Sequence, residues 1–347
     1  MSFCRFVFCK TILNDSNQKH GAGILGVGRY LPYRVLDNNA LTQFVETSDE
    51  WIRSRTGIGA RHLAARDEKT VDLAEHAARK ALENAQLSAE EIDLIIVATS
   101  TPEGAFPSTA SLLQHRIGAK CGGFDLSAAC SGFTYALATA AQFVQNSIYR
   151  NVLVVGAETL SRITDWSDRN TCVLFGDGAG AVVVGRVPAG YGVLGLDLGS
   201  DGSGGHLLKV EAFIPDIEYS NKSPRGDEPQ DRRIYQNGRE VYKFAVHIMG
   251  ESAIRALENA NVAPADVDLL VPHQANIRII ESAAERLKLP MEKVFVNLEK
   301  YGNTDAATIP IALSEAREQG RIKRDDIVVL VGFGGGLSWG SCVLKWY

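Results

Sequence analysis

The sequence of 347 residues lacks several features that mark whole classes of protein. No apolar run approaches the roughly 20 residues of a membrane-spanning helix, so no integral membrane segment is expected. The six cysteines are too few and scattered for a disulfide framework, and no CxxC pair suggests a structural zinc site. With 36 basic and 41 acidic residues the net charge is -5, so the basic excess of a protein whose whole surface binds nucleic acid is missing.

The N-terminal segment also lacks the pattern of a secretory signal. Its short apolar stretch, MSFCRFVFCK, is interrupted by Arg5, whereas the apolar region of a signal peptide is longer and unbroken. Residues 1–21 are therefore interpreted as a poorly ordered extension, and the protein as cytoplasmic with reduced thiols. The rest of the chain, 45% hydrophobic and 22% charged overall, has the composition of an ordinary globular protein.

An internal repeat predicts the architecture. Residues 81–94 read ALENAQLSAEEIDL and residues 256–269 read ALENANVAPADVDL, an offset of 175, and each copy leads from a helical pattern into a short apolar strand. A second match at an offset of 176 relates NVLVVGAE (151–158) to DIVVLVGFG (326–334), two strands that end in glycine. The chain is therefore predicted to be an α/β protein with two related halves, 22–192 and 193–347, whose buried mixed sheets are covered by helices.

A long surface loop is expected over residues 211–238, which are rich in charged residues, proline and glycine. Glycine-rich strings occur in several other parts of the chain. GAGILG (21–26) fits a dinucleotide-binding pattern but lacks the strand-to-helix context that such a site needs. FGDGAGA (175–181) and GFGGGLSWG (332–340) are interpreted as tight turns or as places where the backbone approaches a substrate closely.

Cys130 is the candidate nucleophile. The segment 124–145 has the pattern of a strand, a tight turn and an amphipathic helix, with Cys130 at the turn. Backbone amides at a helix start favour a thiolate and lower its pKa, and they could also stabilise an oxyanion. A buried packing residue remains an alternative for Cys130. The other cysteines lack this context and are interpreted as structural: Cys4, Cys9, Cys121, Cys172 and Cys342.

Two further candidates lie in the second half of the chain. Adding 175 to 130 gives position 305, inside a second turn that leads into a helix and contains Asn303. His273 directly follows the strand VDLLVP, at the edge where α/β proteins build their sites. Ordinary turn chemistry for Asn303 and a buried structural role for His273 are the alternatives.

Taken together, these motifs resemble the thiolase-fold condensing enzymes, and specifically the β-ketoacyl-acyl carrier protein synthase III family, which initiates type II fatty-acid synthesis. The resemblance runs from about residue 22 to the C-terminus and includes TSDEWIRSRTGI (47–58), AACSGFTYAL (128–137), VPHQANIRII (271–280), YGNT (301–304) and FGGGLSWGS (333–341). It implies a thiolase-like fold in which two pseudo-symmetric halves form a five-layer αβαβα sandwich.

The resemblance also implies a reaction. Cys130 would accept an acyl group from acyl-CoA, and malonyl-acyl carrier protein would then lose CO2 and attack the acyl-enzyme. His273 and Asn303 would stabilise the enolate, and the backbone amides of Cys130 and Gly335 would form the oxyanion hole. No metal and no cofactor beyond these substrates is expected, because decarboxylation supplies the carbanion.

Less central positions follow from the same resemblance. Trp51 and Arg55 match residues that sandwich the adenine of CoA, while Arg169 and Asn276 match further CoA contacts. Phe106 matches a residue that a neighbouring subunit inserts at the acyl pocket, which implies a homodimer. The expected docking surface for the acidic carrier protein is basic and consists of Lys243, Arg278 and Arg286.

Two residues depart from the family pattern. Asp305 stands where serine is common, and it could reduce activity or only cap the following helix. Glu285 replaces a commonly basic residue on the docking surface. Three alternatives remain: a relative serving secondary metabolism, a papain-like thiol hydrolase, which would not explain the repeat, and a non-catalytic acyl-CoA-binding protein that keeps the fold.

Overall fold

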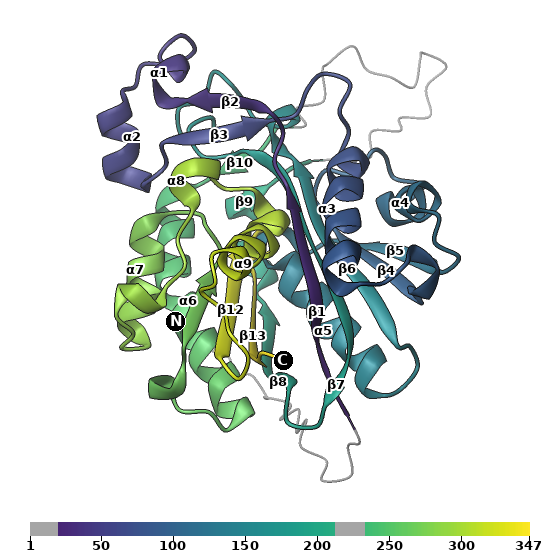
Figure 1. Cartoon of the computed structure of the whole chain (residues 1–347). Helices are drawn as coiled ribbons and strands as arrows, with labels where there is room; N and C mark the ends of the chain where they lie inside the picture. Colours follow the sequence, from purple (N-terminus) through teal and green to yellow (C-terminus); the bar gives the residue numbers. More distant parts are fainter. Residues whose placement is uncertain (1–19, 212–232) are drawn as a thin grey trace.

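Two β-sheets, each covered by helices on both faces, make up the body of the structure (Figure 1). The structure is a computed structural model and describes residues 20–211 and 233–347. Cys4 and Cys9, nearly all of the expected N-terminal extension and most of the expected loop 211–238 lie outside the described residues. The first strand begins at His20, two residues inside the segment expected to be an extension.

Each sheet takes its strands from one half of the chain. The first sheet has the order β1 (His20–Tyr30), β7 (Asp177–Pro188), β6 (Asn151–Thr159), β4 (Leu94–Ala98), β5 (Gly122–Leu126). The second has the order β8 (Gly192–Ser200), β13 (Ser338–Lys345), β12 (Ile327–Gly334), β11 (Leu269–Pro272). The central strands β4, β6, β12 and β13 are buried along nearly their whole length because both faces of their sheets are covered.

The two sheets follow one pairing pattern. In the first, β4 lies parallel to β6, and β7 pairs antiparallel with both β6 and β1. In the second, β11 lies parallel to β12, and β13 pairs antiparallel with both β12 and β8. A parallel bridge from Leu270 to Val294 occupies the place that β5 takes in the first sheet.

Six helices complete the layers. They are α3 (Thr70–Ala85) and α4 (Thr109–Ile117) outside the first sheet, α6 (Gly238–Ala260) and α7 (Ile277–Arg286) outside the second, and α5 (Gly132–Gln145) and α9 (Thr308–Glu318) between the sheets. Buried apolar residues fill each space between neighbouring layers. The predicted fold class, a five-layer sandwich of two similar halves, is confirmed by this arrangement. The position of the boundary at residue 192 stays a prediction.

The repeated sequence forms the same local structure twice. Helix α3 ends before Gln86 and α6 ends before Asn261, and both cap residues have left-handed backbone angles, with φ of 56° and 54°. A short 3-10 helix then leads into β4 or β11. The repeat therefore marks equivalent helix–strand units of the two halves.

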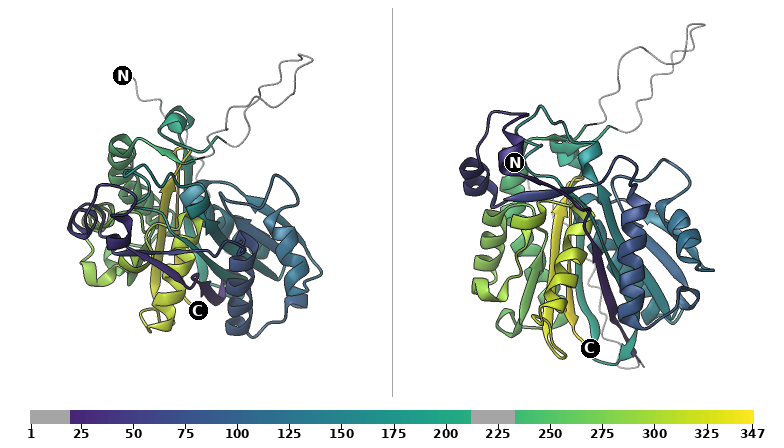
Figure 2. Two further views of the ribbon diagram at one scale, coloured as in Figure 1. Left: turned by 90° about the horizontal axis from the view of Figure 1, so that it is seen from above. Right: turned by 45° about the horizontal axis from the view of Figure 1, so that its top comes forward.

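One unit from the first half of the sequence packs on the second half of the structure. It consists of β2 (Arg34–Asp37), α1 (Asn38–Leu41), α2 (Asp49–Thr56) and β3 (Ala60–Leu63). Its apolar side chains, including Leu41 and Ile52, belong to the same cluster as those of α6 and α7. In both views of Figure 2 this purple unit lies beside the green helices, away from the blue α3 and α4.

Smaller elements complete the described chain: α8 (Leu298–Tyr301) and the two-residue strands β9 (Leu208–Lys209) and β10 (Tyr235–Gln236). None of the helices in the described ranges is long and apolar enough to span a membrane.

Candidate active site

A cavity of about 530 Å³ opens where the starts of the two central helices meet. Cys130, His273 and Asn303 all line it, as do Asp305 and Gly335. The structure therefore brings together the three residues that the sequence patterns selected for catalysis, although 173 residues separate the first from the last. Both halves of the chain contribute to this one cavity.

Cys130 sits at a tight turn between β5 and α5. The turn contains a 3-10 helix, Ala129–Ser131, and Ala129 has a left-handed φ of 45°. Strand β12 approaches so closely that a Cβ atom on Gly334 would stand 2.6 Å from the Cys130 backbone nitrogen, which only glycine allows. The Cys130 side chain is 8% exposed, so the predicted strand–turn–helix placement is confirmed.

The expected lowering of the Cys130 pKa is wrong. Burial raises the pKa of the thiol well above its usual value, and the nearby carboxyl groups of Asp305 and Glu158 raise it further. A helix start stabilises a charge by about 0.3–2 kcal/mol. Full burial, in contrast, shifts a pKa by up to about 3–5 units, at 1.36 kcal/mol per unit, and therefore dominates.

His273 directly follows β11, and its backbone N–H continues the pairing with β12 by donating to the carbonyl of Val331 at 2.8 Å. The imidazole is buried and packs edge-on against Phe333, with 5.6 Å between ring centroids. Neither ring nitrogen has a hydrogen-bond partner among the described residues. Burial lowers the pKa of His273 to about 3, so the ring is neutral and keeps one N–H donor for a ligand in the cavity.

The buried histidine predicts a pH dependence of stability. Because the folded-state pKa of about 3 lies below the unfolded value of 6.5, the neutral ring supports folding fully above pH 6.5 and progressively less as pH falls toward 3. Between pH 7.5 and pH 5.0, wild type is expected to lose about 2 kcal/mol more unfolding free energy than His273→Gln. Urea unfolding at fixed protein concentration measures both slopes, and parallel slopes would contradict the assignment.

Asn303 lies between α8 and the 3-10 helix Asp305–Ala307. Its backbone is fixed by hydrogen bonds to Leu174 and Gly176, both 2.9 Å. The side-chain oxygen accepts the backbone N–H of Asp305 at 2.9 Å, so the amide N–H groups remain as donors. Asn303 and neutral His273 therefore both offer N–H donors to the same cavity.

Gly335 directly follows β12 and lies next to the Cys130 turn. A Cβ atom on it would come within 3.7 Å of the Ala129 side chain. Its backbone and that of Cys130 thus border the same part of the cavity. Their role as an oxyanion hole stays a prediction.

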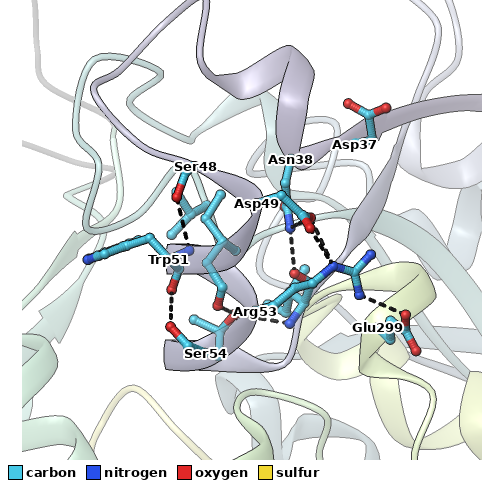
Figure 3. Close-up of polar contacts among 12 residues, drawn as sticks. Asp37, Asn38, Ser48, Asp49, Trp51, Arg53, Ser54 and Glu299 are labelled. Carbon is cyan, nitrogen blue, oxygen red and sulfur yellow. Dashed lines mark hydrogen bonds and ion pairs between the residues drawn. The ribbon is translucent and has the colours of Figure 1, made fainter.

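Trp51 and two arginines lie on the surface near the cavity. Trp51 is on α2, which Ser48 caps at 3.1 Å, and its side chain points away from the network of Asn38, Asp49 and Arg53 (Figure 3). The guanidinium carbon of Arg169 stands 4.8 Å from the centroid of the indole, whereas that of Arg55 stands at 6.0 Å. The structure therefore places Arg169 on the indole more closely than Arg55.

The network beneath Trp51 fixes α2. Arg61, fully buried, donates to Asn38 at 2.8 Å, and Asn38 donates to Asp49 at 2.8 Å. Arg53 pairs with Asp49 on one side and with Glu299 of α8 on the other, at 2.9 and 2.7 Å (Figure 3). The helix that carries Trp51 is thus held to both halves of the molecule.

Asn276 lines the cavity and caps α7. Its oxygen accepts the N–H of Arg278 at 2.9 Å, and its amide donates to the carbonyl of Arg55 at 3.0 Å. Asn276 therefore joins the mouth of the cavity to the helix of Trp51. Its predicted contact with CoA is not tested by these bonds.

Phe106 does not line the cavity of its own chain. It is 87% exposed on the loop between β4 and α4, so its predicted role depends on a second subunit.

The three predicted docking residues are only partly brought together. Lys243 is one residue beyond the lining residue Tyr242, and Arg278 lies at the start of α7 beside Asn276. Arg286 lies at the other end of α7, about 12 Å farther along the axis. Lys243 pairs with Glu240 at 2.8 Å and Arg286 pairs with Glu251, both on α6. Glu285, next to Arg286, is exposed.

Glu158 is a site residue that the sequence patterns did not single out. It is the last residue but one of β6, is fully buried, and lies close to Cys130 and Asp305. The sequence did contain a signal that could have identified Glu158, because it is an ionisable residue at the end of an otherwise apolar strand pattern.

Comparisons with known proteins agree with this geometry. Family descriptions match 3-oxoacyl-[acyl-carrier-protein] synthase III over residues 124–202 and the C-terminal part of that family over residues 257–346. The β-ketoacyl-[acyl-carrier-protein] synthase III of Caldanaerobacter subterraneus is 53% identical over 95% of this chain and 99% of its own. The crystal structure of 3-oxoacyl-[acyl-carrier-protein] synthase III from Aquifex aeolicus superposes on this chain with a TM-score of 0.87. The two sequences are 48% identical, and the match covers 94% of this chain and 100% of the other.

A third relative is the priming β-ketosynthase of the R1128 polyketide pathway, 35% identical with a TM-score of 0.87, covering 95% and 97% of the two chains. The five-layer fold and the Cys–His–Asn cavity thus define a thiolase-fold condensing enzyme. At more than half identity over nearly its full length, the chain belongs to the β-ketoacyl-[acyl-carrier-protein] synthase III family.

Proposed function

We propose that the protein initiates fatty-acid synthesis by joining a short acyl group from acyl-CoA to malonyl-acyl carrier protein. The observation that carries this proposal is the meeting of Cys130, His273 and Asn303 in one cavity of a member of this family. Cys130 first takes the acyl group and releases CoA. Malonyl-acyl carrier protein then loses CO2, and its carbanion attacks the acyl-Cys130 carbonyl to give a 3-oxoacyl product.

The geometry suits the charges that form in these steps. The N–H donors of neutral His273 and of Asn303 suit the enolate oxygen that develops on decarboxylation. The backbone amides of Cys130 and Gly335 suit the oxyanion of each acyl-transfer step. No resident cofactor or metal is needed, because loss of CO2 generates the carbanion.

The experiment that tests the function is intact-mass analysis after brief incubation with a panel of acyl-CoAs, followed by addition of malonyl-acyl carrier protein. An acyl mass on the Cys130 peptide, then a 3-oxoacyl carrier protein, is expected. No adduct with any acyl-CoA would contradict the initiating role.

The second candidate is priming of a secondary-metabolite pathway, which the similarity to the R1128 priming ketosynthase favours. Product formation with malonyl-acyl carrier protein from fatty-acid synthesis, and little with malonyl-CoA, would support our first assignment. Good condensation with malonyl-CoA alone would favour the second.

Trp51 is proposed to hold the adenine of CoA with Arg55 and Arg169, and Asn276 to contact the pantetheine arm. Stacking on an indole is worth about 1–2 kcal/mol, so Trp51→Ala is expected to raise the KM for acyl-CoA about 5- to 30-fold. The maximal rate of Cys130 acylation should not change, because Trp51 lies outside the cavity that holds the thiol.

Two substrates without adenine serve as controls for Trp51→Ala. The KM values for an acyl-pantetheine and for malonyl-acyl carrier protein are expected to stay at the wild-type values. An equal rise for all three substrates would show that Trp51 supports the cavity rather than the nucleotide.

The carrier protein is proposed to dock on the surface of Lys243, Arg278 and Arg286, guided by its acidic charge.

We further propose a cytoplasmic homodimer. Its support is the edge strand β5, which exposes Phe124, and the exposed loop of Phe106 nearby. Light scattering would test the dimer, and a monomer at micromolar concentration would contradict it.

A further inference from the structure

Two carboxyl side chains lie buried beside the Cys130 thiol, and the mechanism above uses neither. Glu158, at the end of β6, is fully buried, and Asp305, at the start of the second helix turn, is 5% exposed. Asp305, Cys130 and Ser100 line the same cavity, and the 3-10 helix of Asp305 packs against both the Cys130 turn and β6. The Asp305 carboxyl is close enough to the Cys130 thiol, the Ser100 hydroxyl and the Glu158 carboxyl for each of them to act on its pKa. Within residues 20–211 and 233–347, no basic residue is among the charges that act on either carboxyl.

The pair holds at least one proton. Two carboxylates in contact, away from water, cannot both ionise, and burial raises the pKa of both Glu158 and Asp305. Three donors point at Glu158: the Thr101 hydroxyl at 2.6 Å, the Ser100 backbone N–H at 2.9 Å and the Thr99 hydroxyl at 3.3 Å.

Asp305 has fewer donors than Glu158, namely the Ser100 hydroxyl and the Cys130 thiol. Its Oδ1 atom is buried without a hydrogen-bond partner among the described residues. The negative charge is therefore better placed on Glu158, where donors surround it, and the shared proton on Asp305. A protonated Asp305 lies between Cys130 and Glu158 and can accept a proton at one oxygen while it donates from the other.

We propose that Asp305 and Glu158 form a proton relay for Cys130, in which Asp305 passes the thiol proton to Glu158 as the sulfur attacks. The proposal rests on the proposed function, since the attacked group is the acyl-CoA thioester. The new bond joins the sulfur of Cys130 to the acyl carbonyl carbon, and the bond from that carbon to the CoA sulfur breaks. The proton returns through Asp305 to the leaving CoA thiolate, so the pair ends with the one proton it began with.

The second half-reaction balances in the same way. Condensation releases Cys130 as a thiolate, which takes the shared proton from the pair, and solvent then restores that proton. The net consumption of one proton matches the loss of a carboxylate as CO2. His273 is less suited to accept the thiol proton, because its ring is buried and no partner in the described part of the chain would stabilise a positive charge on it.

Substitutions of the two carboxyls are expected to give different pH profiles. In Asp305→Asn the amide keeps contact with both neighbours but cannot pass a proton, and Glu158 keeps its charge. Single-turnover acylation at pH 7 is expected to fall about 100- to 10,000-fold and to recover as pH rises. In Glu158→Gln the charge next to Cys130 is gone, so acylation should also fall at pH 7 but recover at a lower pH than in Asp305→Asn.

The test measures the acylation rate from pH 6 to 10 for wild type and both variants, with the acyl-CoA that labels wild type best. The titratable groups at this part of the site are Cys130, Asp305 and His273, which line the cavity, and Glu158, which is buried beside Asp305. Asp177→Asn is the matched control, because that carboxyl is equally buried but is held by Ser161 and Ala64 away from the cavity. Its pH profile should follow wild type, and thermal unfolding shows whether each variant is folded.

A second measurement does not need acyl-CoA. The rate of Cys130 alkylation by iodoacetamide over the same pH range reports how readily the thiol loses its proton. The same order of recovery, Glu158→Gln at lower pH than Asp305→Asn, is expected. Wild-type pH profiles in both folded variants would overturn the relay, whereas failure of wild type to be acylated would overturn the proposed function instead.

Discussion

Cys130→Ala is expected to form no acyl adduct with any acyl-CoA and to lose condensation by about 10⁶-fold, the scale seen when a catalytic nucleophile is removed. The reason is that no other thiol lies in the cavity: of the four free cysteines in the described ranges, only Cys130 lines it. Intact mass with peptide mapping, together with a continuous assay of CoA release, measures both losses.

Cys121→Ala is the matched control for Cys130→Ala. Cys121 is a free, partly exposed thiol just before β5, outside the cavity. The control variant should be acylated on Cys130 like wild type. An adduct in Cys130→Ala, or its loss in Cys121→Ala, would remove Cys130 from the proposed role and favour a non-catalytic acyl-CoA-binding protein.

His273→Ala and Asn303→Ala are expected to slow decarboxylation of malonyl-acyl carrier protein about 100- to 1000-fold each. Each change removes one N–H donor that the structure leaves for the enolate oxygen. Acylation of Cys130 should stay within about tenfold of wild type, because that step develops its charge on a different oxygen. Release of labelled CO2 and single-turnover acylation separate the two steps.

The control for the histidine is His247→Ala, since His247 is exposed on α6 and outside the cavity. Its decarboxylation rate should equal that of wild type. Equal losses of acylation and decarboxylation in His273→Ala would show that the imidazole holds the cavity open rather than stabilising the enolate.

The sequence predicted the layers and the meeting of Cys130 with the second half because both rest on local patterns. Apolar strands and amphipathic helices are set by residue spacing, and the repeat indicated that two helix starts face one region. His273 and Asn303 stand at turns that short-range sequence patterns indicate. The contexts around them, together with the family resemblance, selected them from the other histidines and asparagines.

The charge environment of Cys130 could not be predicted in this way. The thiol pKa depends on burial and on Glu158 and Asp305, which come from strands and turns distant in sequence. The sequence pattern at the helix start indicated only the stabilisation of the thiolate by backbone amides, which is the weaker effect. The predicted direction of the Cys130 pKa shift was therefore wrong.

The glycine string at 175–181 shows a second limit. It was interpreted as a turn or a close approach to substrate, yet most of it lies in β7, in the first sheet. A Cβ atom on Gly180 would stand 2.6 Å from the backbone nitrogen of Ile311 in α9, so the glycine admits a helix instead. Sequence spacing indicates that a backbone approaches closely, but not which partner approaches it.

The two helix starts also differ by one residue from the offset used to relate them. Ala129 and Asp305 share the left-handed conformation, with φ of 45° and 48°, an offset of 176. The positional counterpart of Cys130 is therefore Ala306, not Asp305. Ala306 is 1% exposed, and its carbonyl would stand 2.3 Å from a Cβ atom on Gly156.

The surroundings of Ala306 show that the two copies of the helix start have different roles. The helix start of the first half holds the reactive Cys130, whereas the same position in the second half holds alanine, whose carbonyl faces Gly156 of β6 and whose Cβ atom faces Gly132 of α5. A Cβ atom on Gly132 would already stand 3.5 Å from that of Ala306, so a bulkier group at position 306 would have to push back the start of α5, two residues from Cys130. The small space around position 306 thus keeps the two copies in different roles. Exchanging these roles would need several substitutions at once.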